Sequence, residues 1–114
     1  MSDPRQAGAA AVTGAGGYIG GIVSTALAAD GFQVIRLVRR PEEGSGDRLY
    51  DLRQDPDVNL LEGVDTLIHC AYDFSVTSEA DIWAVNVMGT RRLLEAAAAS
   101  GVRRTLLVLS LIHI

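Results

Sequence analysis

Residues 12–21, VTGAGGYIGG, decide the fold, because they place five glycines within ten positions directly after a short apolar run. Such a stretch can serve as a phosphate-binding turn, a flexible linker or a site of close backbone packing. Residues 9–13 (AAAVT) before it are typical of a short buried strand. After it an apolar stripe recurs at helical spacing and stops at Gly31. The stripe comprises Ile19, Ile22, Val23, Ala26 and Leu27. The glycines therefore predict a turn from strand to helix, because ordered segments flank them too closely for a linker.

The rest of the chain continues this alternation of apolar strands and amphipathic helices. A polar loop is expected at 39–47, a helical turn or two around 55–63, and a long helix at 78–100 that ends before Gly101. Its inward side carries Ile82, Val85, Gly89, Leu93, Ala96 and Ala97. Alternating strands and helices predict one α/β domain over residues 1–114, with helices on both faces of a parallel sheet. The further strands are expected at 32–38, 48–52, 64–72 and 104–112.

The glycine spacing suits a diphosphate. The first backbone N–H groups of a helix are unpaired and lie at the positive end of its dipole. Gly14 would permit the tight turn, Gly17 the approach of the phosphates and Gly20 close packing of helix on strand, with Gly16 as an additional glycine. An empty glycine-rich connection is the alternative. The strand–helix–strand context favours dinucleotide binding.

Five segments carry a resemblance to a known family. They are VTGAGGYIGG at 12–21, YDL at 50–52, VDTLIHCAY at 64–72, NVMGTRRLLEAA at 86–97 and GVRRTLLVLS at 101–110. In this order and spacing they resemble the extended branch of the short-chain dehydrogenase/reductase superfamily, the NAD-dependent epimerase/dehydratase family. The resemblance covers nearly the whole chain. It implies a Rossmann-type doubly wound parallel sheet of strand order 3-2-1-4-5, here truncated after the fifth strand.

The resemblance also implies a cofactor site. The backbone N–H groups of Tyr18 and Ile19 would lie near the pyrophosphate, and Asp51 and Leu52 would flank the adenine.

The same resemblance places Cys70, Ala71 and Tyr72 along the cofactor channel. Asn86 would lie on the long helix and face the sheet. Because a buried amide needs partners, we expect it to hydrogen-bond a neighbouring strand, as a structural bond or as part of a cofactor contact.

The end of the second strand bears on the choice between NAD and NADP. NAD-binding relatives carry an acidic residue there to hold the ribose 2′-hydroxyl. This chain has Val38 followed by Arg39 and Arg40, and arginine forks match a 2′-phosphate. We therefore expect NADP in preference to NAD, the alternative being that both arginines are solvated surface residues.

The family's chemistry uses a tyrosine with a lysine four residues later, and all ten basic residues of this chain are arginine. Ser110 matches the family's catalytic Ser/Thr position. We expect this chain to bind cofactor without turning over substrate. The full-length parent would be an oxidoreductase, epimerase or dehydratase acting on a sugar nucleotide or a small carbonyl or alcohol. The alternative is a non-catalytic NADP-binding sensor of the same fold.

The last six residues, LSLIHI at 109–114, depart from the Ala-, Gly- and Arg-rich composition before them. They match the in-frame translation of a transposase adapter common in sequencing libraries. We expect an adapter artefact that truncates the gene and leaves Ser110 in doubt as a native residue; chance similarity is the alternative. The fifth strand would then be an uncovered apolar edge that promotes aggregation or dimerisation.

Composition bears on the partners, the cellular compartment and the metal sites that are expected for this chain. A net charge of −4 without a basic stretch argues against nucleic acid as a partner, and no apolar run approaches the roughly 20 residues that span a membrane. The single Cys70 fits a reducing compartment, hence the cytoplasm, and is expected to be a buried, inert thiol. With only His69 and His113, no metal site is expected. Asp73 is expected to be a solvated loop acid, the alternative being a contact with substrate. The parent protein is a candidate homodimer.

Overall fold

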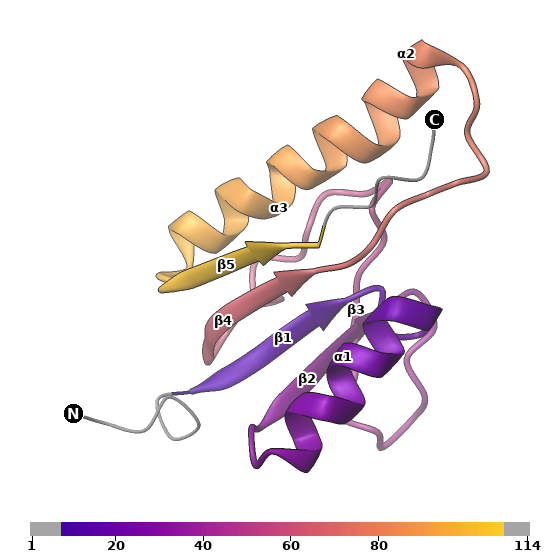
Figure 1. The fold of residues 1–114 in the computed structure, drawn as a ribbon. Coiled ribbons are helices and arrows are strands. Elements are labelled where there is room, and N and C mark those ends of the chain that lie inside the picture. Colours follow the sequence, from indigo (N-terminus) through magenta and orange to yellow (C-terminus); the bar gives the residue numbers. More distant parts are fainter. Residues whose placement is uncertain (1–7, 109–114) are drawn as a thin grey trace.

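A five-stranded parallel sheet forms the centre of the molecule (Figure 1). The computed structural model describes residues 8–108, so the expectations for Ser110, His113 and residues 109–114 lie outside the described residues. The strand order is β3-β2-β1-β4-β5, which confirms the predicted order, and every neighbouring pair is parallel. The strands are β1 (Ala9–Thr13), β2 (Val34–Val38), β3 (Arg48–Leu49), β4 (Val64–His69) and β5 (Arg104–Leu107).

Three of the strands are shorter than predicted at their carboxyl ends. β4 ends at His69 because the N–H groups of Cys70 and Ala71 donate to the side chain of Thr13 instead of continuing the ladder. β3 has only two residues, because the chain turns after Leu49 and buries the residues that follow. β5 ends at Leu107. The segment 55–63, where a helical turn was expected, forms turns and no helix.

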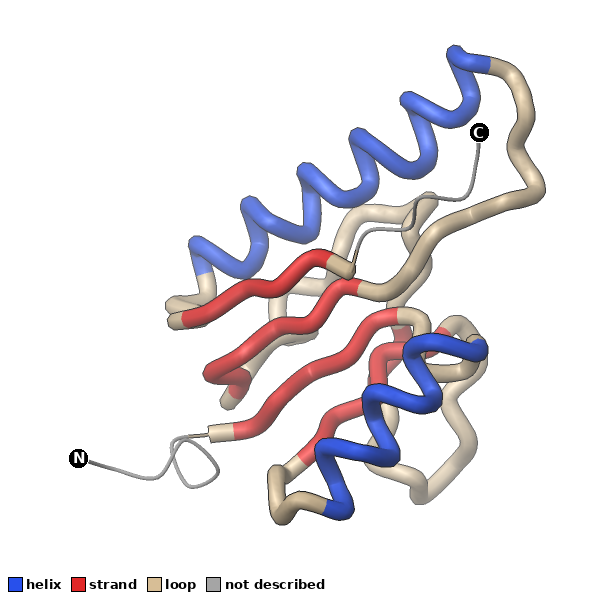
Figure 2. Tube along the Cα trace, viewed as in Figure 1, coloured by secondary structure: helices blue, strands red, loops and turns tan. Residues whose placement is uncertain are grey.

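Helices cover both faces of the sheet (Figure 2). Helix α1 (Tyr18–Ala29) packs on the face that carries Val12 and Ile68. The opposite face holds the larger core, in which Leu67 of β4 and Leu93 of helix α3 (Met88–Ala99) are fully buried. Successive residues of β1 therefore belong to different cores, as the alternation of side chains along a strand requires.

The predicted apolar stripe of α1 is only partly confirmed. Val23 and Leu27 pack against the core, whereas Ile19 and Ile22 are about half exposed. The buried residues of α1 are instead Gly20 and Ser24. The Ser24 hydroxyl donates a hydrogen bond to the Gly20 carbonyl at 2.8 Å. Small residues occupy this side because the helix here lies against backbone.

The predicted helix at 78–100 is confirmed, with an internal irregularity. It begins as α2 (Glu79–Ile82), capped by Ser78, whose hydroxyl accepts from the Asp81 N–H at 3.1 Å. A π-helical segment (Trp83–Val87) connects α2 to α3. The inward residues of the predicted stripe are buried or half-buried. Gly101, with φ +78°, follows the end of α3.

None of the helices formed by residues 8–108 combines the length and the apolar character that crossing a bilayer requires.

Candidate functional site

An open cleft of about 890 Å³ lies at the carboxyl edge of the sheet. Its walls are the glycine turn after β1, the end of β2, the loop after β3 and the loop after β4. Ligands of open α/β sheets bind at this edge, where the strand order reverses. Every predicted cofactor residue except Asn86 lines the cleft: Gly14, Gly16, Gly17, Tyr18, Ile19, Gly20, Arg39, Arg40, Asp51, Leu52, Cys70, Ala71 and Tyr72.

Two glycines of the turn are required by its geometry. Gly14 has φ +65°, and a Cβ there would lie 3.0 Å from the Ala71 nitrogen. A Cβ on Gly20 would lie 2.1 Å from the Gly14 carbonyl oxygen. The tight turn predicted at Gly14 is confirmed. The close packing predicted at Gly20 is confirmed too, although its nearest neighbour is the turn and not the strand.

The middle of the turn is open. A Cβ on Gly16 would meet nothing within 4 Å, and Gly17 is the N-cap of α1 without a side chain to cap the helix. The first turn of α1 also carries no acidic residue. Its leading N–H groups, those of Tyr18 and Ile19, therefore border the cleft beside free space. This arrangement suits an anionic group, since helix N-termini attract negative charge.

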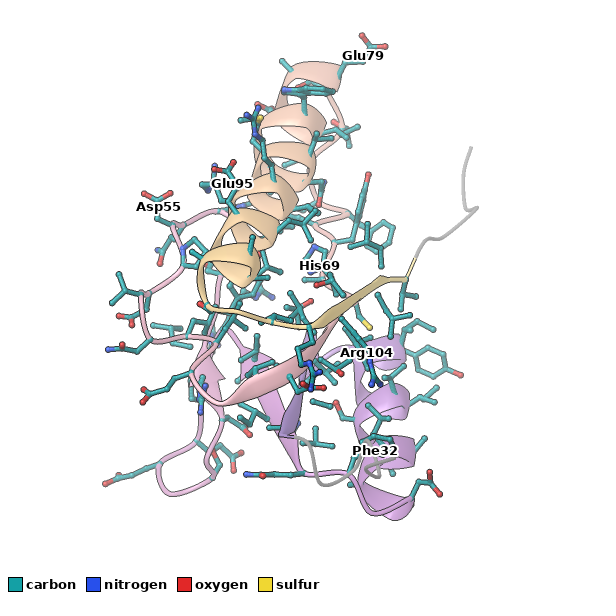
Figure 3. The ribbon with its side chains drawn as sticks, turned by 90° about the vertical axis from the view of Figure 1, so that its left-hand side faces the viewer. Phe32, Asp55, His69, Glu79, Glu95 and Arg104 are labelled. Atoms are coloured by element: carbon teal, nitrogen blue, oxygen red, sulfur yellow. The ribbon has the colours of Figure 1, made fainter. Side chains whose placement is uncertain are left out.

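A buried polar chain supports the β4 side of the cleft. The Thr13 hydroxyl oxygen lies 2.9 Å from the Cys70 nitrogen and 3.0 Å from the Ala71 nitrogen, and it accepts from both N–H groups. The same oxygen lies 2.7 Å from Nδ1 of His69, whose Nε2 lies 2.8 Å from the Thr90 hydroxyl on α3. In Figure 3 His69 lies between α3 and the strands. Burial lowers the pKa of His69 to about 4, so the ring is neutral at pH 7.

The loop after β3 is clamped against α3. A Cβ on Gly89 would lie 2.4 Å from the Leu52 carbonyl oxygen, and Arg92 donates to that oxygen at 3.1 Å. Asp51 accepts from the Arg53 N–H through Oδ1 at 2.9 Å. Tyr50 is buried beneath, and its hydroxyl has no hydrogen-bond partner among the described residues. Burial raises the pKa of this phenol to about 12.

Asn86 holds the loop after β4 in place. The predictions made for Asn86 and for Asp73 both need correction. Asn86 bonds the Asp73 backbone twice, through Oδ1 to the N–H at 2.7 Å and through Nδ2 to the carbonyl at 3.1 Å. Its partner is therefore loop backbone and not a strand, and Asn86 does not line the cleft. The prediction that Asp73 is a solvated loop acid is met only in part, because its carboxylate is engaged by neighbouring side chains. Its carboxylate, 17% exposed, bonds Ser75 and pairs with Arg53, and these bonds lower its pKa.

Five charged side chains from β2 and the loop after it also line the cleft, those of Arg36, Arg39, Arg40, Glu42 and Asp47. Arg39 and Arg40, which the sequence singled out, are exposed there. Arg36, Glu42 and Asp47 were missed. Arg36 lies within the predicted strand, and strand periodicity gives no signal that a side chain reaches a turn elsewhere in the chain. It donates to the Ala15 carbonyl and to Asp47, both at 3.2 Å.

Cys70 is half-buried and borders the cleft, where burial raises the pKa of its thiol. The prediction of a buried thiol is thus met only in part, while an unreactive thiol agrees with the raised pKa. Within residues 8–108, no three His, Cys, Asp or Glu side chains are grouped to hold a metal ion.

Proteins of known name include several that are similar in sequence to this chain. The Methylococcus capsulatus sterol demethylase protein B is 37% identical over 103 residues, which cover 82% of this chain and 31% of that protein. The Haloferax volcanii L-arabinose 1-dehydrogenase (NAD(P)(+)) is 34% identical over 96 residues, covering 82% of this chain and 37% of the relative. This chain thus spans about a third of the length of these curated relatives.

Solved structures also resemble this chain in fold. MoeE5, solved in complex with UDP-glucose and NAD, superposes with a TM-score of 0.76 at 33% identity, over 91% of this chain and 37% of that one. Residues 10–111 match the family described as the NAD dependent epimerase/dehydratase family. Since that match spans nearly the whole sheet with its glycine turn, the chain belongs to the NAD-dependent epimerase/dehydratase family.

Proposed function

We propose that the cleft binds a nicotinamide dinucleotide. The observation that carries the proposal is the open space at Gly16, beside the uncapped start of α1 and between two glycines that cannot carry a side chain. A diphosphate placed there meets unpaired N–H groups and no Cβ atoms. The cleft volume of about 890 Å³ suits a ligand of this size.

The other walls define where the two halves of the dinucleotide would lie. The adenosine would lie toward the end of β2 and toward Asp51 and Leu52, and the nicotinamide toward Cys70, Ala71 and Tyr72. Asn86 does not line the cleft but supports it, because its two hydrogen bonds to the Asp73 backbone hold the loop that continues this wall. When bound, the nicotinamide would accept or supply a hydride, while these residues bind and orient it.

We infer a preference for NADP over NAD. Arg39 and Arg40 follow β2 directly and are exposed in the cleft, where guanidinium groups can contact a 2′-phosphate. The name of the Haloferax relative, an NAD(P)(+) dehydrogenase, is compatible with either dinucleotide.

We propose that the complete protein is an NAD(P)-dependent oxidoreductase, epimerase or dehydratase of a sugar nucleotide or a small carbonyl or alcohol. The support is the family and the relatives, one named for L-arabinose oxidation and one solved with UDP-glucose. We assign to the present residues the binding of the cofactor and no proton transfer, because no tyrosine of this chain has a lysine partner. The cytoplasmic location and the homodimer stay predictions.

The test is titration of NADP⁺ and NAD⁺ into the wild-type chain and into Gly16→Val, followed by calorimetry. A Cβ at Gly16 meets nothing within 4 Å, and the valine side chain would extend into the proposed diphosphate position. We therefore expect at least about a hundredfold loss of affinity, with thermal unfolding verifying that the variant is folded. Gly21→Ala is the matched control, because its Cβ makes only an ordinary contact, 3.5 Å from the Ala15 carbonyl, outside the cleft lining. Equal affinity of wild type and Gly16→Val would contradict the proposed site.

A further inference from the structure

Arg36 and Asp47 form an ion pair inside the cleft that the proposed function does not use. Nη1 of Arg36 lies 3.2 Å from Oδ2 of Asp47, and Nη2 lies 3.2 Å from the Ala15 carbonyl oxygen. The arginine side chain is 43% exposed and the aspartate side chain only 9%. One guanidinium thus links the glycine turn to an almost buried carboxylate.

The backbone holds Asp47 in this place. Leu37 of β2 pairs with Arg48 of β3, so the residues that precede them, Arg36 and Asp47, come side by side. The Asp47 N–H donates to the Ser45 hydroxyl at 3.1 Å, and that hydroxyl donates to the Glu42 carbonyl at 2.6 Å. Asp47 is therefore a fixed part of the cleft wall and not a freely moving loop acid.

The position of the pair matters for the adenosine ribose. It lies between the glycine turn and the end of β2, where the ribose 2′ position of a bound dinucleotide is expected. A carboxylate accepts a hydrogen bond from a 2′-hydroxyl but repels a 2′-phosphate. A guanidinium favours the phosphate. While Asp47 is paired with Arg36, a phosphate gains less attraction from that arginine and also lies near the negative carboxylate of Asp47.

We propose that Asp47, through its ion pair with Arg36, sets the dinucleotide preference of this chain by opposing the attraction of Arg39 and Arg40 for a 2′-phosphate. The inference rests on the proposed function. It adds that two opposing effects set the relative affinity for the two dinucleotides. The two exposed arginines favour NADP, and the buried carboxylate of Asp47 favours NAD.

The experiment is calorimetric titration of NADP⁺ and NAD⁺ into the wild-type chain, Asp47→Asn, Asp47→Glu and Glu43→Gln. Removal of the Asp47 charge should lower the Kd of NADP⁺ by about tenfold, and should change that of NAD⁺ by less than about threefold. Asp47→Glu keeps the charge and should keep the wild-type ratio of the two constants. Glu43→Gln is the matched control, since Glu43 is exposed in the same loop and does not line the cleft.

Two results would overturn the inference alone. One is an unchanged ratio of the NADP⁺ and NAD⁺ dissociation constants in Asp47→Asn. The other is an equal change of that ratio in Glu43→Gln, which would show that the net charge of the loop, and not the ion pair, sets the preference. Wild-type chain that binds neither dinucleotide would overturn the proposed function, and the inference with it. Thermal unfolding of Asp47→Asn verifies that the loop change has not unfolded the chain; in an unfolded variant the ratio in Asp47→Glu decides, and a tenfold change there would contradict the inference.

Discussion

His69 shows how the hydrogen bonds around a buried side chain fix its protonation state. The Thr13 hydroxyl accepts from two backbone N–H groups, which occupies both of its lone pairs. Its own hydrogen must therefore go to Nδ1 of His69, and the ring then carries its proton on Nε2 and donates to Thr90. A second ring proton would face the Thr13 hydrogen. The neutral ring is thus part of the support of residues 70 and 71, which line the cleft.

This predicts a pH dependence of stability. The pKa of His69 is about 4 in the folded chain and about 6.5 in the unfolded chain, so the unfolded chain takes up the proton first. The contribution is complete above pH 6.5 and is lost as the pH falls toward 4, by up to about 3 kcal/mol. Urea unfolding at several pH values between 7.5 and 4 measures it. His69→Gln should lose less free energy over this range; equal losses in the two proteins would contradict the argument.

At the scale of elements, the sequence predicted what depends on neighbours along the chain. The turn at Gly14 follows from glycines at fixed offsets, and the inward side of α3 follows from apolar periodicity. The strand order was predicted from the resemblance to the family, and the structure confirms it. The pairs Arg36–Asp47 and Arg53–Asp73 could not be predicted. Each joins residues of different loops or strands, and charged residues in loops carry no periodicity that selects a partner.

The α1 stripe was wrong in part for a related reason. Helical spacing identified the apolar residues of α1 but not which of them face the sheet, because the approach of the turn at Gly20 sets the rotation of the helix. Likewise, a buried amide at Asn86 could be predicted to need partners, but the π-helical segment around it aims the side chain at the loop backbone of Asp73.

The contact between α3 and the loop after β3 gives a prediction at this scale. In Gly89→Ala the new Cβ would lie 2.4 Å from the Leu52 carbonyl oxygen and 2.8 Å from the Leu52 Cδ1 atom, so helix or loop must shift. We expect a loss of about 2 kcal/mol in unfolding free energy and weaker dinucleotide binding, because Asp51 and Leu52 move with the loop. Chemical denaturation measures the first effect and calorimetry the second.

Gly16→Ala is the matched comparison for stability, because its Cβ meets nothing within 4 Å and Gly16 is not at a positive φ. It should unfold like wild type. A Gly89→Ala chain as stable as Gly16→Ala would show that α3 does not press on the loop.

At the scale of the whole molecule, the two edges of the sheet differ. β3 lies at one edge and is only two residues long, which limits pairing with another chain. β5 lies at the other edge of the sheet (Figure 1). All four of its residues are exposed. Leu106, Leu107 and Val108 are each 43–55% exposed and follow one another along the chain. An apolar strand with a free row of backbone N–H and C=O groups is a template for another strand.

We therefore expect the 114-residue chain to associate through β5 as its concentration rises, as measured by size-exclusion chromatography with light scattering. Leu106→Lys places a charge on the edge and should raise the Kd of association by about tenfold, because pairing would bury that charge. Val58→Lys is the matched control: Val58 is 88% exposed in a loop far along the chain from β5, so the same substitution should leave association unchanged. If the wild-type chain stays monomeric at high concentration, or if both variants reduce association equally, β5 is not the surface through which the chains meet.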